Sequence, residues 1–312
     1  MTKIYDSIVE LVGNTPILRL NKWESEHNLN ASLLAKCEFY NPLFSVKDRA
    51  ALKMIEKAEQ EQKITEDTVF VEATSGNTGI ALAAICASKG YKLVITMPEN
   101  MSKERIVMMR YLGAEVILTP KEDGMKGAIA KANLLKEKNK NVIMFEQFTN
   151  CANADAHRFG TSIEIMEDTS GDVDVLVAGV GTSGTLTGIA GTLKSNNPDL
   201  YVVAVEPKSS AVLNGKQAGV HDIGGIGAGF VPPLYDESLV NEVFDVEDEK
   251  AWDTAGKIAK IEGLPVGISA GAAIFAATEI AKRKEFAGKN IVVILPDGIN
   301  NYLSRVLDKT DF

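Results

Sequence analysis

A lysine at the predicted start of a helix is a candidate for covalent chemistry in this chain. In residues 41–49 (Asn-Pro-Leu-Phe-Ser-Val-Lys-Asp-Arg), a loop marked by Asn41-Pro42 is followed by apolar residues at helical spacing, which places Lys47 in the first helical turn. The helix dipole disfavours a cation there. A lysine with a depressed pKa could attack a carbonyl and form a Schiff base, whereas a solvated lysine is the ordinary alternative. Lys47 alone does not decide between them.

A loop of small polar residues is a candidate anion site. The stretch Thr-Ser-Gly-Asn-Thr-Gly at residues 74–79 follows a predicted strand at 69–73 and precedes a predicted helix at 78–88. Such a turn presents backbone N–H groups and hydroxyl donors at a helix N-terminus, which suits a carboxylate or a phosphate. The alternative is a turn with a helix cap, but the run of consecutive small polar residues exceeds what a cap requires.

A second glycine-rich loop has two interpretations. Residues 179–185 (Gly-Val-Gly-Thr-Ser-Gly-Thr) follow a predicted strand, open a helix and match the dinucleotide fingerprint G-x-G-x-x-G, with Glu206 at the end of the next strand. An NAD-dependent dehydrogenase would place Gly179–Gly184 on a pyrophosphate and Glu206 on a ribose. The loop's three hydroxyl residues instead suit a terminal phosphate, and Pro207 stiffens the segment that would have to meet the ribose.

Residues 265–272 (Pro-Val-Gly-Ile-Ser-Ala-Gly-Ala) contain a third turn, which leads into a predicted helix. Its Ser269 lies near the helix start. Serine is a common N-cap residue, so this position taken by itself favours capping over function.

The elements that position these loops alternate between strands and helices. We predict strands at residues 32–37, 69–73, 92–97, 115–119, 142–145, 173–178, 201–205 and 291–295, and helices at 78–88, 102–112, 125–138, 184–194, 248–261 and 270–284, besides the helix that begins near Lys47. This order predicts an α/β protein with mostly parallel sheets covered by helices. Two series of elements predict two lobes with a cleft between them, one of residues 41–150 and one of residues 1–40 and 151–312.

Composition limits the possible partners. The chain has 312 residues, 45% hydrophobic and 24% charged, with a net charge of −9, which argues against nucleic-acid or anionic-membrane partners. No signal peptide or membrane-length apolar run is expected. Three widely spaced cysteines and three scattered histidines predict no metal site, and a reducing cytoplasm is the expected location. Of the cysteines, Cys86 is expected to be a small buried apolar residue.

The motifs together resemble a known family. They occur in that family's order at residues 13–16 (Gly-Asn-Thr-Pro), 41–49, 74–79, 97–105, 181–185, 206–207, 225–230 and 267–269, over nearly the whole chain. The set resembles the fold type II pyridoxal-phosphate enzymes, whose fold is like that of the tryptophan synthase β chain. The closest resemblance is to the cysteine synthases, also called O-acetylserine sulfhydrylases.

The resemblance implies a cofactor and a role for each motif. Lys47 would carry pyridoxal 5'-phosphate as a Schiff base and act as the general base, and the lobe of residues 41–150 would be the mobile, substrate-binding one. The larger lobe would hold the cofactor, with its phosphate on Gly181, Thr182, Ser183, Gly184 and Thr185, its ring hydroxyl on Asn77 and its pyridine nitrogen on Ser269. The substrate carboxylate would lie on Thr74, Ser75, Asn77, Thr78 and Gln147. No metal ligand is implied.

The implied reaction is β-replacement at an amino acid with a β-leaving group. In cysteine synthesis, O-acetyl-L-serine and sulfide give L-cysteine and acetate. The chain departs from cysteine synthases at residues 150–154, at Ala270 and at Gly225, and residues 295–302 are more similar to cystathionine β-synthases. An alternative therefore uses cysteine or serine with a thiol amino acid, gives lanthionine or cystathionine, and releases hydrogen sulfide from cysteine. A homodimer and a complex with serine acetyltransferase are further expectations from the resemblance.

Overall fold

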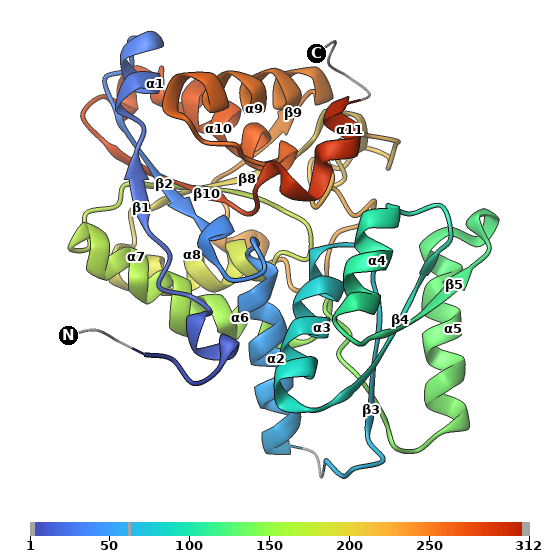
Figure 1. The fold of residues 1–312 in the computed structure, drawn as a ribbon. Coiled ribbons are helices and arrows are strands. Elements are labelled where there is room, and N and C mark those ends of the chain that lie inside the picture. Colours follow the sequence, from blue (N-terminus) through green and yellow to red (C-terminus); the bar gives the residue numbers. More distant parts are fainter. Residues whose placement is uncertain (1–3, 62–63, 308–312) are drawn as a thin grey trace. The chain divides into compact units, whose positions relative to one another are not determined.

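The chain forms two compact units. The computed structural model describes residues 4–61 and 64–307 (Figure 1). Within these limits the first unit consists of residues 4–12, 41–43 and 47–153, and the second of residues 13–40, 44–46 and 154–307. Residues 4–12 were expected with the larger lobe. They group with the first unit because the short helix η1 (Ile8–Leu11) packs there, and Ser7 Oγ lies 2.9 Å from Ser88 Oγ.

The first unit is built on a parallel sheet. In the described residues its order is β5 (Glu115–Thr119), β4 (Lys92–Pro98), β3 (Val69–Ala73) and β6 (Val142–Met144). Alternate residues of β3 face opposite sides, since successive side chains in a strand point in opposite directions. Phe70 packs among the helices of one face, and Val71 packs with Ala132 of α5 (Gly124–Lys138) on the other.

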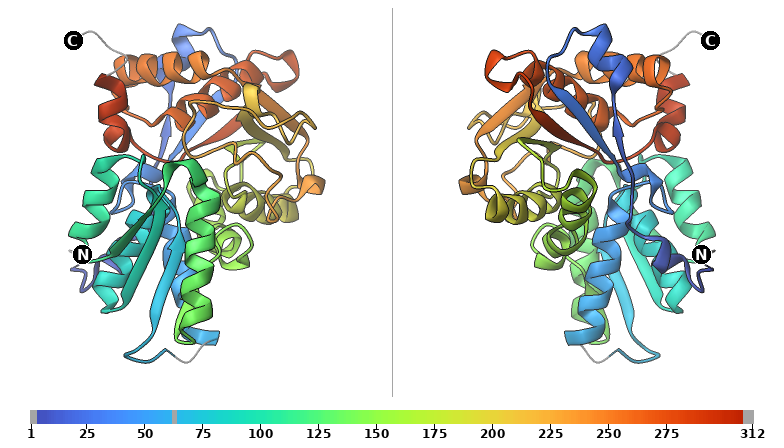
Figure 2. Two further views of the ribbon diagram at one scale, coloured as in Figure 1. Left: turned by 90° about the vertical axis from the view of Figure 1, so that its right-hand side faces the viewer. Right: turned by 90° about the vertical axis from the view of Figure 1, so that its left-hand side faces the viewer.

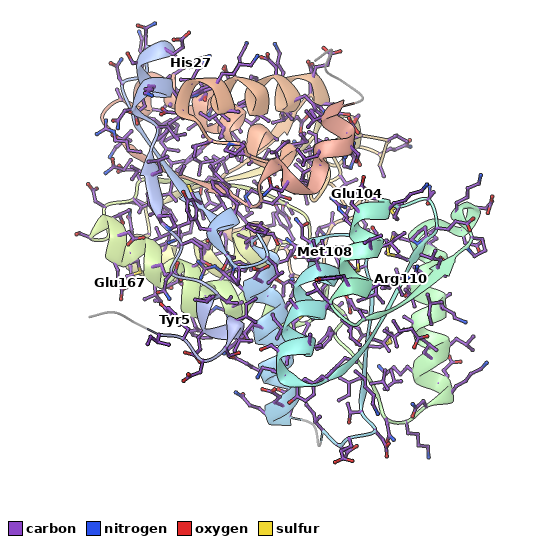
Figure 3. All side chains as sticks on the ribbon, viewed as in Figure 1. Tyr5, His27, Glu104, Met108, Arg110 and Glu167 are labelled. Atoms are coloured by element: carbon purple, nitrogen blue, oxygen red, sulfur yellow. The ribbon has the colours of Figure 1, made fainter. Side chains whose placement is uncertain are left out.

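Three helices cover the first of these faces: α2 (Lys47–Glu61), α3 (Asn77–Lys89) and α4 (Lys103–Tyr111). The α4 helix shows how the sequence sets its orientation. Ser102 caps it by accepting a hydrogen bond from the Arg105 backbone N–H, and Met109 is fully buried. Met108 and Arg110 lie on its exposed side (Figure 3), so α4 buries one stripe only.

The second unit has a larger, mostly parallel sheet. Among the described residues the order is β1 (Ile17–Arg19), β2 (Ser32–Cys37), β10 (Asn290–Leu295), β7 (Val175–Gly179), β8 (Tyr201–Pro207) and β9 (Glu242–Val246). The edge strand β1 pairs antiparallel with β2, and the remaining pairs are parallel.

Helices cover both faces of this sheet. Val177 and Val203 pack with α1 (Asn21–Glu26), α9 (Asp248–Glu262) and α10 (Ile268–Ala281), whereas Leu176 and Val202 pack with α7 (Ser162–Thr169) and α8 (Gly184–Asn196). Figures 1 and 2 show these two helical layers on either side of the sheet. Both faces of the central strands are buried, which explains their continuous apolar sequences.

The predicted fold class is confirmed, and most predicted elements differ from the observed ones by one or two residues at their ends. The sequence pattern did not predict α1, α6 (Cys151–Ala156), the π-helix at residues His157–Thr161, α7 or β9. The buried position expected for Cys86 is also confirmed. In the described part of the chain, we find no helix with both the length and the apolar character needed to cross a membrane.

Candidate functional site

The first unit carries its predicted site residues at the carboxyl edge of its sheet. The strand β3 ends at Ala73, and the loop that follows leads into α3, whose first residue is Asn77 and whose N-cap position is Gly76. Thr74 and Thr78 are buried at either end of this turn, while Ser75 is half-buried. The turn therefore presents the backbone N–H groups of a 13-residue helix together with hydroxyl and amide side chains, as an anion site requires.

A second loop of the same unit meets this turn. Gln147 follows β6 and is buried, and its side-chain Oε1 accepts a 2.8 Å hydrogen bond from Thr78 Oγ1. The structure thus brings together two predicted substrate-binding residues that are 69 positions apart in the sequence. Arg105 of α4 donates from Nη1 to the Ser75 carbonyl at 3.4 Å, which adds a cation to the same turn.

Lys47 begins α2 in this unit. The α2 helix precedes β3 in the chain, and Figure 1 shows the two running in opposite directions. Ala51, Met54 and Ile55 of α2 pack in one core with Ile80 and Ala81 of α3, so the two helices lie side by side (Figure 1). Asp48 fixes the approach to α2 because its Oδ2 accepts the Leu43 backbone N–H at 2.7 Å.

The second unit carries the glycine-rich loop between β7 and α8. Thr182 and Ser183 are buried there, and Ser183 has a positive φ of 68° just before the helix begins. A left-handed residue at this point turns successive backbone N–H groups toward one side, as in an anion-binding nest. Thr185 Oγ1 lies 3.2 Å from His157 Nε2, and His157 Nδ1 lies 2.9 Å from Thr161 Oγ1, so this hydroxyl belongs to a buried polar chain.

Gly225 lies close both to this loop and to Ser269. A Cβ added at Gly181 would lie 2.3 Å from the Gly225 carbonyl oxygen, so the two backbones touch and Gly181 tolerates no side chain. A Cβ added at Gly225, whose φ is 97°, would lie 3.8 Å from Ser269 Oγ. Ser269 is buried in the first turn of α10. The phosphate-type loop and the predicted ring-binding serine therefore lie in one region of the second unit.

Glu206 does not have the role that the dehydrogenase interpretation gave it. Its carboxylate is buried and accepts the backbone N–H groups of Leu213 at 2.9 Å and Asn214 at 3.0 Å. Burial raises the pKa of this carboxyl group, and the two backbone hydrogen bonds oppose the rise. Glu206 therefore anchors the segment that follows β8 and is not directed at a ribose.

A comparison with protein families decides between the interpretations. The family described as "Pyridoxal-phosphate dependent enzyme" matches residues 8–297 of the chain. The chain belongs to the pyridoxal-phosphate-dependent enzymes. The NAD-dependent alternative is wrong, because the loop at residues 179–185 opens α8 within a pyridoxal-phosphate fold and Glu206 is already engaged by backbone.

Individual members of this pyridoxal-phosphate family are similar over their full length. Cysteine synthase B of Campylobacter jejuni is 46% identical over 305 residues, which cover 98% of this chain and 99% of the relative. A cysteine synthase structure from Entamoeba histolytica has a TM-score of 0.96 and 41% identity, covering 100% of this chain and 93% of the other. A hydrogen sulfide-producing enzyme from Fusobacterium nucleatum has a TM-score of 0.92 and 42% identity, covering 97% and 99%.

The donor groups of the second unit fit the family's cofactor. The loop combines hydroxyl side chains with the N-terminus of the 13-residue helix α8, and a phosphate dianion takes many such hydrogen bonds. The close approach of Gly225 to Gly181 and Ser269 places backbone beside the predicted ring-binding serine.

Two residues near these sites were missed from the sequence. His157 lies in a helical region that was not predicted, so nothing linked it to Thr185. Glu72 is a lone acid in an otherwise apolar strand, and that isolated charge was a usable signal.

Proposed function

We propose that this pyridoxal-phosphate enzyme is a cysteine synthase that converts O-acetyl-L-serine and sulfide into L-cysteine and acetate. The observation that carries the proposal is its full-length similarity to cysteine synthases, at 46% identity for the Campylobacter jejuni enzyme. The anion-type turn of the first unit and the phosphate-type loop of the second provide the two kinds of site that an amino acid and this cofactor need.

The chain's residues have separate roles in this proposal. Pyridoxal phosphate, when bound, supplies an electron sink for negative charge at the substrate α-carbon. Lys47 Nζ is the attachment point of the cofactor and the base that takes the α-proton. Ser269, an uncharged partner, leaves the ring nitrogen largely unprotonated, which favours loss of a β-substituent over other outcomes. Asn77 binds the ring hydroxyl, and the phosphate is held by Gly181, Thr182, Ser183, Gly184 and Thr185.

The substrate carboxylate is assigned to the first unit. We assign its binding to Thr74, Ser75, Asn77, Thr78 and Gln147, and support comes from the helix N-terminus at Asn77 and the 2.8 Å bond between Thr78 and Gln147. The first unit is then the substrate-binding lobe, and the second holds the cofactor phosphate and ring. The mobility of the first unit is part of the same proposal, because closing over the substrate would exclude water.

The test is a β-replacement assay with matched lysine variants. The purified protein should be yellow and should form cysteine from O-acetyl-L-serine and sulfide. Lys47→Ala should lose the borohydride-reducible cofactor linkage and the activity. Lys53→Ala is the control on the same helix, since Lys53 only pairs with Glu56 at 3.2 Å on a partly exposed surface. Full cysteine formation by Lys47→Ala would contradict the assignment.

A second candidate uses the same site with another sulfur partner. Cysteine or serine would be the donor, a thiol amino acid the nucleophile, and cysteine would release hydrogen sulfide. Two observations favour it: the similarity to a hydrogen sulfide-producing enzyme, and Gly225, which leaves the space beside Ser269 Oγ without a side chain. Incubation with cysteine alone separates the candidates. Rapid sulfide release with lanthionine, and poor turnover of O-acetyl-L-serine, would favour the second.

A homodimer, a complex with serine acetyltransferase and a cytoplasmic location complete the proposal. They are supported by the resemblance to cysteine synthases. Sedimentation at micromolar concentration should give the mass of two chains, and a mass of one chain would contradict the dimer.

A further inference from the structure

Glu72 is a buried carboxylate beside the proposed carboxylate-binding turn. It is the fourth residue of β3, two positions before Thr74, and its exposed fraction is 3%. Its side chain projects on the same face of the sheet as that of Phe70, the face covered by α2, α3 and α4. None of the roles assigned above uses this residue.

The carboxylate holds the backbone of the loop that carries Gln147. Glu72 Oε2 accepts the Glu146 backbone N–H at 2.9 Å, and Oε1 accepts the Gln147 backbone N–H at 3.3 Å. Glu146 has a positive φ of 54°, a conformation that non-glycine residues rarely adopt and that surrounding contacts must hold. Glu72 therefore stabilises a sharp turn that fixes where Gln147 begins.

The same carboxylate also acts on the Gln147 side chain. Thr78 Oγ1 donates to Gln147 Oε1 at 2.8 Å, so the amide oxygen faces α3. Because Gln147 Oε1 already accepts from Thr78, the Gln147 group left for the Glu72 carboxylate is the amide NH2, and this side-chain hydrogen bond lowers the pKa of Glu72. Contacts at both ends of the amide thus select one of its two orientations.

The charged form of a carboxyl group is costly to bury at this position. Burial raises the pKa of Glu72 to about 7, against the opposing effect of its hydrogen bonds to residues 146 and 147. A buried charge contributes less to stability than a well-packed neutral residue does. Its presence is understandable if the acceptor-only chemistry of the carboxylate is required to orient Gln147.

We propose that Glu72 is a positioning residue, which orients the Gln147 amide so that an N–H of that amide is directed at the carboxylate of the amino-acid substrate. This inference rests on the proposed assignment of the Thr74–Thr78 turn and Gln147 to that carboxylate. In this arrangement the Thr78 hydroxyl donates a hydrogen bond to Gln147 Oε1. The Gln147 amide NH2 then donates one hydrogen bond to Glu72 and one to the substrate carboxylate. Glu72 itself does not contact substrate.

The experiment compares ligands with and without a carboxylate. L-serine and L-serine methyl ester are titrated into the cofactor-loaded enzyme, and binding is followed by the absorbance of the cofactor. In Glu72→Gln the carboxamide can accept only one of the two backbone N–H groups, and the Gln147 amide is free to invert. We expect the dissociation constant for L-serine to rise about tenfold to a hundredfold, while that for the methyl ester changes less than about twofold.

Two further variants separate positioning from general damage. Glu72→Asp keeps the charge but shortens the side chain, so L-serine should again bind more weakly than to the wild type. Glu24→Gln is the control, because Glu24 is a mostly buried carboxylate of α1 whose Oε1 accepts the Leu33 backbone N–H at 2.7 Å. It should leave both dissociation constants as in the wild type.

A double-mutant cycle gives the decisive comparison. With Gln147→Ala in place, adding Glu72→Gln should weaken L-serine binding by less than about twofold, because the group that Glu72 orients has been removed. Equal weakening of both ligands by Glu72→Gln, or unchanged binding of L-serine, would overturn the inference. Failure of the wild type to respond to either ligand would instead refute the proposed function, and the inference with it.

Discussion

The buried carboxylate of Glu72 should make the stability of the first unit depend on pH in a particular direction. Its pKa is about 7 in the folded chain against an ordinary value of 4.5, chiefly because burial disfavours the charged form, with a further rise from the nearby Glu146 carboxylate. The folded state therefore binds this proton more tightly than the unfolded state does. Stability from this group is fully present below pH 4.5 and is lost as the pH rises toward 7.

The size of the effect follows from the two pKa values. Their difference corresponds to about 3 kcal/mol, since each pKa unit is worth about 1.4 kcal/mol. Glu72→Gln has no titrating group at this position. We therefore compare the free energies of unfolding of the wild type and of Glu72→Gln. Relative to the variant, the wild type should lose about 3 kcal/mol of stability between pH 4 and pH 8, with most of the loss between pH 5 and pH 7.

Urea unfolding at several pH values, followed by far-UV circular dichroism, measures this difference. A matched control is Glu24→Gln, because Glu24 is also a mostly buried carboxylate but belongs to the second unit. A circular dichroism difference that stays constant across the range would refute the reasoning, because Glu72 would then titrate alike in the folded and unfolded chain.

Two further predictions concern the second unit. Gly181→Ala should weaken cofactor binding at least about tenfold, because its Cβ would lie 2.3 Å from the Gly225 carbonyl oxygen and the backbones must separate. Gly191→Ala, whose Cβ would have its nearest neighbour at 3.8 Å, should retain cofactor affinity and gain about 0.5–1 kcal/mol of stability; equal affinities in the two variants would contradict this. Tyr302→Phe should lower the free energy of unfolding by about 1–3 kcal/mol, since it removes the 2.7 Å hydrogen bond to the buried Asp297; unchanged urea unfolding would count against it.

Sequence periodicity predicted the fold well where burial is uniform. Strands such as β7 and β10 are apolar on both faces because helices cover both, and their continuous apolar runs identified them. The strand β9 was missed because it lies at the sheet edge, where most of its residues are only half-buried and polar residues interrupt the pattern. The region of residues 151–169 was missed because a π-helix interrupts its helical period.

The turns of the candidate site were predictable because each is a continuous stretch of sequence. The loops at residues 74–79 and 179–185 are continuous stretches at strand-to-helix turns, and the structure has them there. Contacts between distant segments were not predictable from one sequence. No local sequence pattern indicates the hydrogen bond of Thr78 to Gln147 or those of Glu72 to the backbone of residues 146 and 147. Each depends on how separate strands align in the sheet.

The central position of β10 has a consequence for synthesis of the protein. This strand lies between β2 and β7 in the second unit, yet it is formed by residues 290–295, near the end of the chain. A ribosome releases every strand of the first unit's sheet by residue 144, so that sheet can pair while translation continues. The strand β2 is synthesised early, and about 250 further residues are added before β10 can pair with it. During that interval the edge of β2 that later pairs with β10 has no strand beside it, so the sheet of the second unit is the later of the two to be completed.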